Sequence, residues 1–390
     1  MLNKKKTVVA IVAVMLFLGS ITGFFYHQAD ANSKGYQGEF EKLFLIYDLI
    51  ESGFVEEVDS EKLVRGAIEG MIDALDDPYS GYLTEEEFEE MQSDMEGEYG
   101  GLGIIITERE GQLTIVSPFD DTPGDRAGLQ SNDMIMEIDG EKTEDMAMEN
   151  AVDRMRGEPG TSVELLIKRV DEDDESKSEE FEVKIVREMI ELEYVTHELL
   201  DNDIGYIEFS RFGEDVGYEL SNSLSELKEQ GARGFILDVR NNPGGLLTEA
   251  SRVVSSFIES GPAVYVQERS GAMEPMNVDP RIETFDEPLV IISNRGSASG
   301  SEILIGAIQD AERGTIVGQR TFGKGSVQNV IPLRDGSGTR LTVAQFYTPN
   351  ERIIDPENGL QPDIEVELDF ETEADEQLDK AIEIMLDKLN

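Results

Sequence analysis

The chain has 390 residues, which is enough for two or three domains with separate hydrophobic cores. Its 83 acidic residues outnumber 33 basic ones, for a formal net charge of -50, and such a surface repels the phosphates of nucleic acids and anionic lipids. With no cysteine and two histidines, cysteine nucleophiles are excluded, and metal sites built on His or Cys clusters nearly so. We interpret the acidic excess as a solvated surface suited to a saline medium, where salt screens its self-repulsion.

Residues 1–31 are typical of a targeting segment rather than of a folded domain. The lysines at positions 4–6 precede an uncharged apolar stretch, Thr7–Tyr26, that is long enough to span a bilayer. Because such lysines stay on the cytoplasmic side, the rest of the chain is expected outside the cytoplasm. Ala29–Ala31 also fits a signal-peptidase site. The segment is therefore either a membrane anchor, which its length favours, or a signal cleaved after Ala31 to release a secreted protein.

Residues 34–95 carry apolar side chains at the three- and four-residue spacing of amphipathic helices. Turn-forming residues at 76–81 interrupt this pattern, and Thr84 with Glu87 then fits a capping box at the start of another helix. Nothing in this region indicates chemistry, so we expect core helices or an oligomerisation arm.

Residues 96–190 form short β-rich runs separated by glycines, which predicts a small β-rich domain. A glycine turn and the strand that it leads into occupy Gly100–Ile106. We further expect a helix, two strands and an acidic hairpin tip between the strands, over Asn150–Met155, Ser162–Arg169, Phe181–Val186 and Asp171–Glu175, respectively.

From residue 191 to about residue 370, strands and helices alternate, which predicts an α/β fold with helices packed on a sheet. The expected strands are Ile204–Phe209, Phe235–Val239, Ala263–Gln267, Leu289–Ser293, Thr315–Val317, Val327–Pro332 and Leu341–Phe346. The expected helices are Val216–Glu229, Thr248–Ile258 and Ser301–Arg313. Residues 371–390 repeat apolar side chains at helical spacing and are expected to form an amphipathic helix that docks on another surface.

A serine in a small-residue turn is the strongest chemical feature of the chain. Ser299 lies in the run NRGSASGSE, between a predicted strand and a predicted helix, where its hydroxyl can project above the sheet. A helix N-terminus favours developing negative charge, so the backbone N–H of Gly300 is a candidate oxyanion donor. A second donor could come from Gly244 or Gly245 in the glycine turn of residues 241–245, where backbone can approach a substrate closely.

With cysteine absent and histidine scarce, lysine is the best candidate for the base of a nucleophilic mechanism. Lys324 lies in the run TFGKGSVQ and alternates with Ser326 and Gln328 along a predicted strand, which places the three on one face. A lysine acts as a base only if its pKa falls about 3 units below its usual value near 10.4, which burial can achieve. Gln328 suits the role of a neutral partner, because its amide oxygen can accept from the amine without adding charge.

Other serine-based arrangements fit the sequence less well. Ser225 begins a Ser-x-x-Lys match to penicillin-recognising enzymes, but it falls in a polar helix and the accompanying motifs are absent. His197 lies in a strand-like run and is interpreted as structural. A Gly-Ser-Ala-Ser turn is common by itself, so spacing alone does not establish a catalytic site.

Taken together, these motifs resemble those of the C-terminal processing peptidases, also called tail-specific proteases. The resemblance implies that Ser299 is the nucleophile, Lys324 the base and Gln328 the third catalytic residue, and that Asp238–Gly245 (DVRNNPGG) is the oxyanion loop. It also implies a ClpP/crotonase-like α/β protease core, often assembled through terminal helices. One departure is Gly300, where relatives commonly have alanine, and a backbone donor is unaffected by that difference.

The region from Tyr99 to Arg187 likewise resembles a PDZ domain, with Gly101, Leu102, Gly103 and Ile104 as its carboxylate-binding loop. Backbone N–H groups of such a loop would hold a terminal carboxylate while the peptide adds as a strand beside Ile104. An apolar pocket would then accept the last side chain of the peptide.

In this family the PDZ domain also gates the active site when a substrate tail binds. If that holds here, Arg156 is a candidate coupling residue, since a cation near the bound tail could sense its charge. The alternative is a helix-end arginine that pairs with a nearby acid.

The sequence therefore predicts a serine endopeptidase that cleaves extracytoplasmic proteins with apolar C-terminal tails, with no metal or other cofactor and no nucleic-acid partner. The chain is expected to form a homodimer or a higher homo-oligomer. Its predicted segments are a targeting segment (1–31), a helical region (34–95), an inserted PDZ domain (96–190), a peptidase core (191–370) and a terminal helix (371–390). Two rivals remain: a non-catalytic PDZ scaffold that only binds tails, and an HtrA-like PDZ protease that uses His197.

Overall fold

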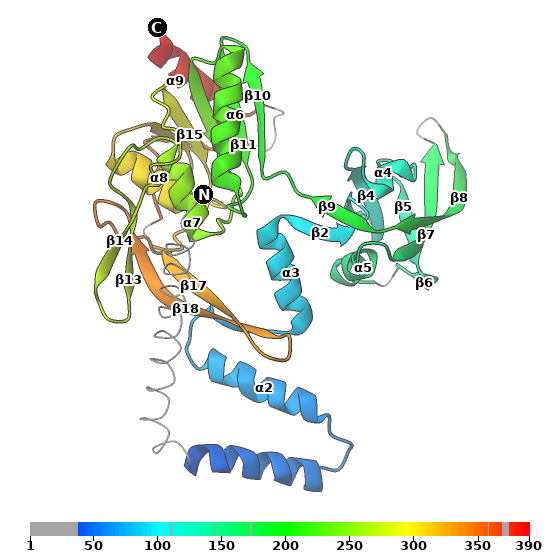
Figure 1. The fold of residues 1–390 in the computed structure, drawn as a ribbon. Helices are drawn as coiled ribbons and strands as arrows, with labels where there is room; N and C mark the ends of the chain where they lie inside the picture. Colours follow the sequence, from blue (N-terminus) through cyan, green and yellow to red (C-terminus); the bar gives the residue numbers. More distant parts are fainter. Residues whose placement is uncertain (1–37, 110, 145, 172–173, 358, 369–373) are drawn as a thin grey trace, which may run out of the picture. The chain divides into compact units, whose positions relative to one another are not determined.

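The computed structural model describes residues 38–109, 111–144, 146–171, 174–357, 359–368 and 374–390. The chain divides into two compact units, residues 1–78 and residues 79–390 (Figure 1). The first unit, described from residue 38, contains a helix over residues 38–53 and α2 (Ser60–Asp73).

Two predictions fall on residues outside the described ones. The apolar stretch predicted to anchor the chain, Thr7–Tyr26, is the first, and the middle of the predicted acidic hairpin tip, residues 172–173, is the second. Among the residues that are described, no helix has the length and apolar character needed to cross a bilayer.

The second unit begins with β1 (Gly81–Leu83) and α3 (Glu85–Glu96). The predicted capping box at the start of α3 is confirmed. Thr84 N donates to Glu87 Oε2 at 2.7 Å, and Glu87 N donates to Thr84 Oγ1 at 3.2 Å. These bonds satisfy backbone groups that a helix start otherwise leaves unpaired.

The β-rich region predicted for residues 96–190 is present as an antiparallel sheet in the order β3-β4-β5-β7-β8, with β6 paired to β5. Its strands are β3 (Ile104–Arg109), β4 (Gln112–Pro118), β5 (Met134–Ile138), β6 (Glu141–Lys142), β7 (Ser162–Asp171) and β8 (Asp174–Val186). Helices α4 (Pro123–Arg126) and α5 (Met148–Met155) accompany this sheet, and β2 (Glu98–Gly101) pairs separately with β9 (Glu188–Glu191). The strand β3 forms one edge of the sheet, where a further strand can add.

The predicted α/β core is confirmed as a six-stranded sheet in the order β10-β11-β12-β15-β16-β19. Only the β10–β11 pair is antiparallel within this sheet. The strands are β10 (Val195–Leu200), β11 (Ile204–Phe209), β12 (Gly234–Asp238), β15 (Leu289–Ser293), β16 (Thr315–Gly318) and β19 (Ile364–Glu365). Its central strands β12 and β15 are buried along their whole length, as expected for strands covered on both faces.

Helices cover both faces of this sheet (Figure 1). One face packs against α6 (Val216–Gln230), α7 (Leu247–Ser255) and α8 (Gly300–Asp310), and the other against α9 (Glu376–Leu389). Alternation along β12 supplies both cores, because Phe235 and Leu237 face the first group of helices while Ile236 faces α9.

A second sheet carries the segment after the predicted lysine motif. Its order is β1-β18-β13-β14, with β17 paired to β18. The strands are β13 (Pro262–Glu268), β14 (Met273–Asn277), β17 (Ser326–Pro332) and β18 (Gly338–Tyr347). The register of β17 against β18 shifts between Val327 and Gln328. The extra residue, Val343, lies on β18, and Lys324 precedes the start of β17, so the shared face of Lys324, Ser326 and Gln328 stays a prediction.

Candidate active site

Ser299 lies at the turn between β15 and α8, as its sequence context predicted. Its backbone has φ 52° and ψ -107°, a conformation that costs a non-glycine residue about 1–3 kcal/mol. Such a residue stays in place only if its surroundings hold it. The serine turn (residues 294–299) is held in part by Ser297, whose buried Oγ donates to Val239 O at 2.7 Å.

The glycine loop (residues 241–245), which follows β12, is bonded to the serine turn. Asn242 is fully buried, and its backbone oxygen accepts from Ala298 N and from Ser301 Oγ, each at 3.0 Å. Asn242 Nδ2 also donates to Phe209 O at 2.7 Å, at the end of β11. The loop and the turn are therefore fixed to each other and to the sheet.

Only glycine fits where the glycine loop meets Ser299. At Gly244, where φ is 98°, a Cβ would lie 2.7 Å from Gly300 N and 2.7 Å from Ser299 Cβ. The N–H of Gly244, one of the predicted oxyanion donors, already donates to Asn242 Oδ1 at 2.9 Å. Among the described residues, the N–H groups of Gly245 and Gly300 have no acceptor. These two donors are free to meet a substrate oxygen, and Gly244 instead provides the close approach.

A buried carboxylate, which the sequence analysis did not single out, joins the serine turn to the lysine loop (residues 321–325). Glu302 Oε2 accepts from Ser299 N at 2.9 Å and from Lys324 N at 2.8 Å. Its Oε1 accepts from Thr321 Oγ1 at 2.6 Å and from Gly323 N at 2.7 Å. The carboxylate thus fixes the backbone of the serine and of the lysine at once.

The charge of Glu302 is set by two opposing effects. Burial raises the pKa of its carboxyl, while the four hydrogen bonds lower it, and the balance lies above the ordinary value. Three of the four donors are backbone N–H groups, which cannot accept a hydrogen bond. Both oxygens must therefore act as acceptors, which the carboxylate form satisfies.

Lys324 is half-buried in a setting that disfavours its charged form. Burial lowers the pKa of its amine, the nearby cation of Arg340 lowers it further, and the Glu302 carboxylate opposes both. Tyr79 contacts both cations, because Lys324 Nζ lies 5.1 Å from its ring centroid and Arg340 Nε donates to its backbone oxygen at 2.9 Å. The pKa of Lys324 is therefore shifted in the direction that a lysine base requires.

Gln328 lies near Lys324 without the predicted contact. Its Nε2 donates to Ser326 Oγ at 2.8 Å and to Thr342 Oγ1 at 3.3 Å. Within the described part of the chain, no hydrogen bond joins Gln328 to the Lys324 amine, and none joins that amine to Ser299 Oγ. The three side chains share one groove, but they are not bonded as a working dyad with an orienting amide.

This serine groove has a volume of about 760 Å³. The residues predicted for catalysis and for the oxyanion site all line it, namely Ser299, Lys324, Gln328, Gly244, Gly245 and Gly300. Helix α3 supplies apolar side chains on its wall, including Phe88, Met91 and Met95. The groove could therefore hold an extended apolar segment against the serine.

Residues 354 and 355, which follow β18, lie in close contact with the lysine loop. A Cβ at Gly323 would overlap Asp355 O, and a Cβ at Gly325 would overlap Ile354 O. This close contact explains why glycine flanks the lysine in the sequence.

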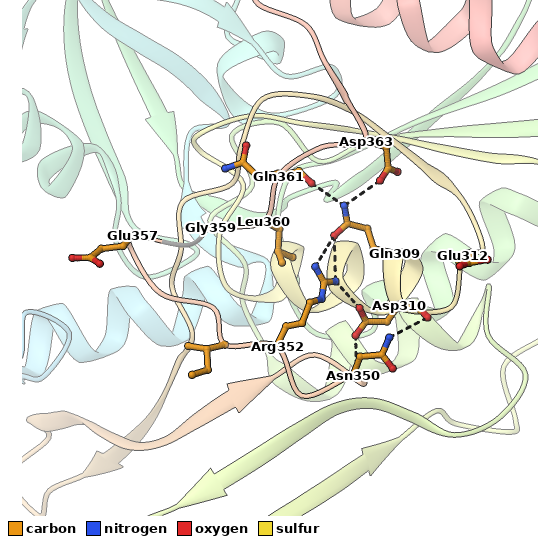
Figure 2. A pocket seen from close by; sticks show the side chains of 11 residues that line it. Gln309, Asp310, Glu312, Asn350, Arg352, Glu357, Gly359, Leu360, Gln361 and Asp363 are labelled. Carbon is orange, nitrogen blue, oxygen red and sulfur yellow. Dashed lines mark hydrogen bonds and ion pairs between the residues drawn. The ribbon is translucent and has the colours of Figure 1, made fainter.

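The same segment is bonded to the far end of α8, around a pocket of about 600 Å³ (Figure 2). Arg352 Nη2 lies 2.7 Å from Asp310 Oδ1, and Asn350 N donates to Asp310 Oδ2 at 2.7 Å. Gln309 Nε2 donates to Gln361 O at 2.8 Å. Because these groups bond one another, we interpret the pocket as structural. Its bonds hold the segment after β18 against α8, and this segment contacts the lysine loop.

A second groove, which we call the β3–α5 groove, has a volume of about 310 Å³. Three of the residues predicted to bind a terminal carboxylate line it, namely Gly101, Leu102 and Ile104, together with apolar residues of α5. Gly103, with φ 68°, makes the turn between them. Among the described residues, the N–H groups of Leu102 and Gly103 have no acceptor, so they are available to an anionic ligand.

Arg156, the predicted coupling residue, also lines the β3–α5 groove. Its Cζ lies 5.0 Å from the centroid of the Tyr99 ring, and its Nη1 lies 3.6 Å from Glu90 Oε1 on α3. Glu90 in turn lines the serine groove. The arginine therefore pairs with a nearby acid, as the alternative held, and this acid belongs to the helix that walls the serine groove.

The rival residues lie outside the serine groove. His197 Nε2 is 3.4 Å from Glu226 Oε2, on β10 and α6, respectively, and it is not among the lining residues. Ser225 Oγ donates to Ser221 O at 2.9 Å within α6, as a helix-surface serine does. Neither residue is placed to act with Ser299.

Comparison with known proteins gives three matches to protein families. Residues 203–366 match peptidase family S41, residues 114–169 match the PDZ domain, and residues 22–87 match the activating protease CtpB N-terminal domain. The first match includes the serine turn and the lysine loop, and the second includes β5 and most of β4 and β7 of the sheet that carries the β3–α5 groove.

Individual relatives agree with these matches. The chain is 38% identical over 328 residues to a carboxy-terminal-processing protease of Bartonella bacilliformis, covering 83% of this chain and 74% of the relative. It is 34% identical over 362 residues to the carboxy-terminal processing protease CtpA of Bacillus subtilis, covering 93% and 76%. Among solved structures, a photosystem II D1 C-terminal processing protease is 28% identical with a TM-score of 0.50, covering 83% and 86%.

We expect Glu302→Gln to weaken both the fold and the activity. The substitution turns one oxygen into an NH₂ group facing N–H donors, and a buried donor left without its acceptor costs about 1–3 kcal/mol. Denaturant unfolding should show a loss of that size, and the rate of peptide cleavage should fall. Glu312→Gln, at an exposed position after α8, is the matched control. Equal behaviour of the two variants would contradict the role assigned to Glu302.

Proposed function

This chain belongs to peptidase family S41, among the carboxy-terminal processing proteases, and from that premise we propose that it cleaves proteins with a Ser299–Lys324 dyad after its PDZ domain binds their C-terminal tails. It is a serine-type peptidase with a PDZ domain. The observation that carries the proposed dyad is the Glu302 carboxylate, which accepts an N–H from both residues at one groove.

In the proposed mechanism, the neutral amine of Lys324 takes the proton of the Ser299 hydroxyl as Oγ attacks the scissile carbonyl carbon. The carbonyl oxygen becomes an oxyanion, which the N–H groups of Gly245 and Gly300 stabilise. The protonated lysine then gives its proton to the leaving amine, and an acyl-enzyme remains on Ser299. Lys324 next takes a proton from water, whose oxygen attacks the ester, and it returns that proton to Ser299 as the second product leaves.

The tail is proposed to bind as a strand along the free edge of β3. Its carboxylate would meet the backbone N–H groups of Leu102 and Gly103, and its last side chain would enter the apolar β3–α5 groove. Backbone donors suffice to hold one carboxylate, so the acidic surface of the protein does not prevent binding. The apolar lining supports a preference for apolar tails.

Tail binding is also proposed to switch on the dyad. The structure has no hydrogen bond between the Lys324 amine and Ser299 Oγ, so the two side chains must move together before the dyad can work. A bound carboxylate would compete with Glu90 for Arg156 and so release α3, whose side chains wall the serine groove. Movement of that wall would let the amine, the hydroxyl and the Gln328 amide come into contact.

We further propose that the protein works outside the cytoplasm as a homodimer or a higher homo-oligomer. Residues 1–31 would tether it to the membrane, or release it if cleaved after Ala31. Large apolar side chains exposed on the N-terminal unit, such as Phe44, Leu49 and Val55, support self-association, because a monomer would leave them in water.

The first test compares Ser299→Ala and Lys324→Ala with the wild type on a peptide that ends in an apolar tail. Loss of the nucleophile or of the base should lower kcat/KM by about 10³-fold or more, while tail binding measured by fluorescence anisotropy stays unchanged. His197→Ala is the control and should retain full activity. A wild-type protein that forms its oligomer and binds the tail but cleaves nothing would support the scaffold alternative.

The second test concerns the pKa of Lys324. The base works when neutral, so kcat/KM should rise with pH through that pKa, which burial and Arg340 hold below the ordinary lysine value. Arg340→Gln removes a cation that lowers this pKa, while burial and Glu302 stay, so the rise should move to higher pH. Arg340→Lys keeps the charge and should keep the profile. An unshifted profile in Arg340→Gln would contradict the assignment of Lys324 as the base.

The third test concerns coupling through Arg156. In Arg156→Gln, addition of a separate tail peptide should no longer stimulate cleavage of a tail-free substrate, since the cation that senses the carboxylate is gone. Arg154→Gln is the control, because Arg154 pairs with Glu141 and does not line the β3–α5 groove. If both variants respond to the tail as the wild type does, Arg156 has no part in gating.

A further inference from the structure

Arg240 precedes the glycine loop and joins it to two carboxylates. Its Nε lies 3.0 and 2.9 Å from the two oxygens of Asp238, at the end of β12. Its Nη1 and Nη2 donate to Oδ1 and Oδ2 of Asp375, at 2.9 and 2.8 Å, in a bidentate pair. The side chains of Arg240 and Asp238 are 15% and 6% exposed, so water screens their pair little, whereas the Asp375 side chain is 37% exposed.

Asp375 comes from the other end of the sequence and is fixed by the C-terminal helix. It caps the start of α9, where its Oδ1 accepts from Leu378 N at 3.0 Å. The first turn of α9 is held by the buried Gln377, whose Nε2 donates to Val366 O at 2.8 Å. Ala381 and Met385 are fully buried against the sheet. The carboxylate that pairs with Arg240 therefore lies at the start of a helix that is docked on the sheet.

The two residues after Arg240, Asn241 and Asn242, are hydrogen-bonded to the serine turn. Asn241 N donates to Asn294 Oδ1 at 2.9 Å, and Asn294 Nδ2 donates back to Asn241 Oδ1 at 2.9 Å. Asn242 O then accepts from Ala298 N at 3.0 Å, next to Ser299. A displacement of Arg240 would therefore shift both the glycine loop and the turn against which it lies.

We infer that Asp375 is a positioning residue for the cleavage reaction, which through Arg240 lets the docked C-terminal helix set the place of the oxyanion donor Gly245. The inference rests on the proposed function, because it assigns Gly245 N–H to the transition state. Asp375 lies on the α9 side of Arg240 and does not line the serine groove. Its removal leaves the Arg240–Asp238 pair intact, so the loop keeps one of its two charged anchors and loses its precise placement.

The test is steady-state cleavage of a tail-bearing peptide by the full chain and by Asp375→Asn. The isosteric amide removes the charge and one acceptor, so kcat should fall about tenfold while KM and tail affinity stay within about twofold. Asp375→Glu keeps the charge and should recover part of the loss. Asp379→Asn, one turn further along α9 and exposed, is the matched control and should behave as the wild type.

A double-mutant cycle with Arg240→Gln separates positioning from general destabilisation. If Asp375 acts through Arg240, the kcat losses of the two variants should not add, and adding Asp375→Asn to Arg240→Gln should change kcat by less than about twofold. Additive losses, or a kcat of Asp375→Asn equal to that of Asp379→Asn, would overturn the inference. So would a loss in Asp375→Asn that tracks a fall in Tm and that Asp375→Glu does not rescue. A wild type without cleavage would instead refute the proposed function, and the inference with it.

Discussion

The bonds to the buried Glu302 carboxylate are the contact on which the rest of the site depends. One side chain accepts from the backbone of Ser299 and from that of Lys324, and these residues belong to segments that leave different strands of the sheet. The strained backbone of the serine persists because its own N–H ends on this carboxylate. A backbone bond from Phe322 N to Ser297 O at 3.0 Å also joins the two segments, but Glu302 is the group that bonds Ser299 and Lys324 themselves.

The same region resolves a conflict between the acidic surface and a neutral lysine. A formal charge of -50 favours protonated amines across the protein, so only local structure can lower the pKa of Lys324. Burial does most of this, and Arg340 adds a like charge. Glu302 opposes both, but its oxygens are occupied by four donors that already compensate its charge. The carboxylate can thus organise the site without holding the lysine protonated.

The strands of the core could be predicted well from the sequence. The hydrogen bonds and ion pairs that join the segments of the site could not. The strand Leu289–Ser293 is found as predicted, because its apolar run ends at clear turn residues. The helix expected to reach Ile258 ends at Ser255, where a tertiary bond from Phe285 N to Ser256 O competes with the helix. The bulge at Val343, opposite Val327 and Gln328, depends on the pairing of β18 with β17, which no local pattern reveals. For the same reason, the roles of Glu302, Arg340 and Asp375 became visible only in three dimensions, and the predicted segment boundaries remain predictions.

Whether Lys324 is the base is tested most directly by measuring the pKa of its amine in the wild-type protein. Carbon-13 labelling of lysine side chains, with Lys324→Arg used to assign the signal, allows NMR titration of this one amine. We expect a midpoint clearly below the ordinary lysine value near 10.4. A midpoint at or above that value in the tail-bound protein would mean that the amine stays charged under working conditions, and Lys324 could not be the base.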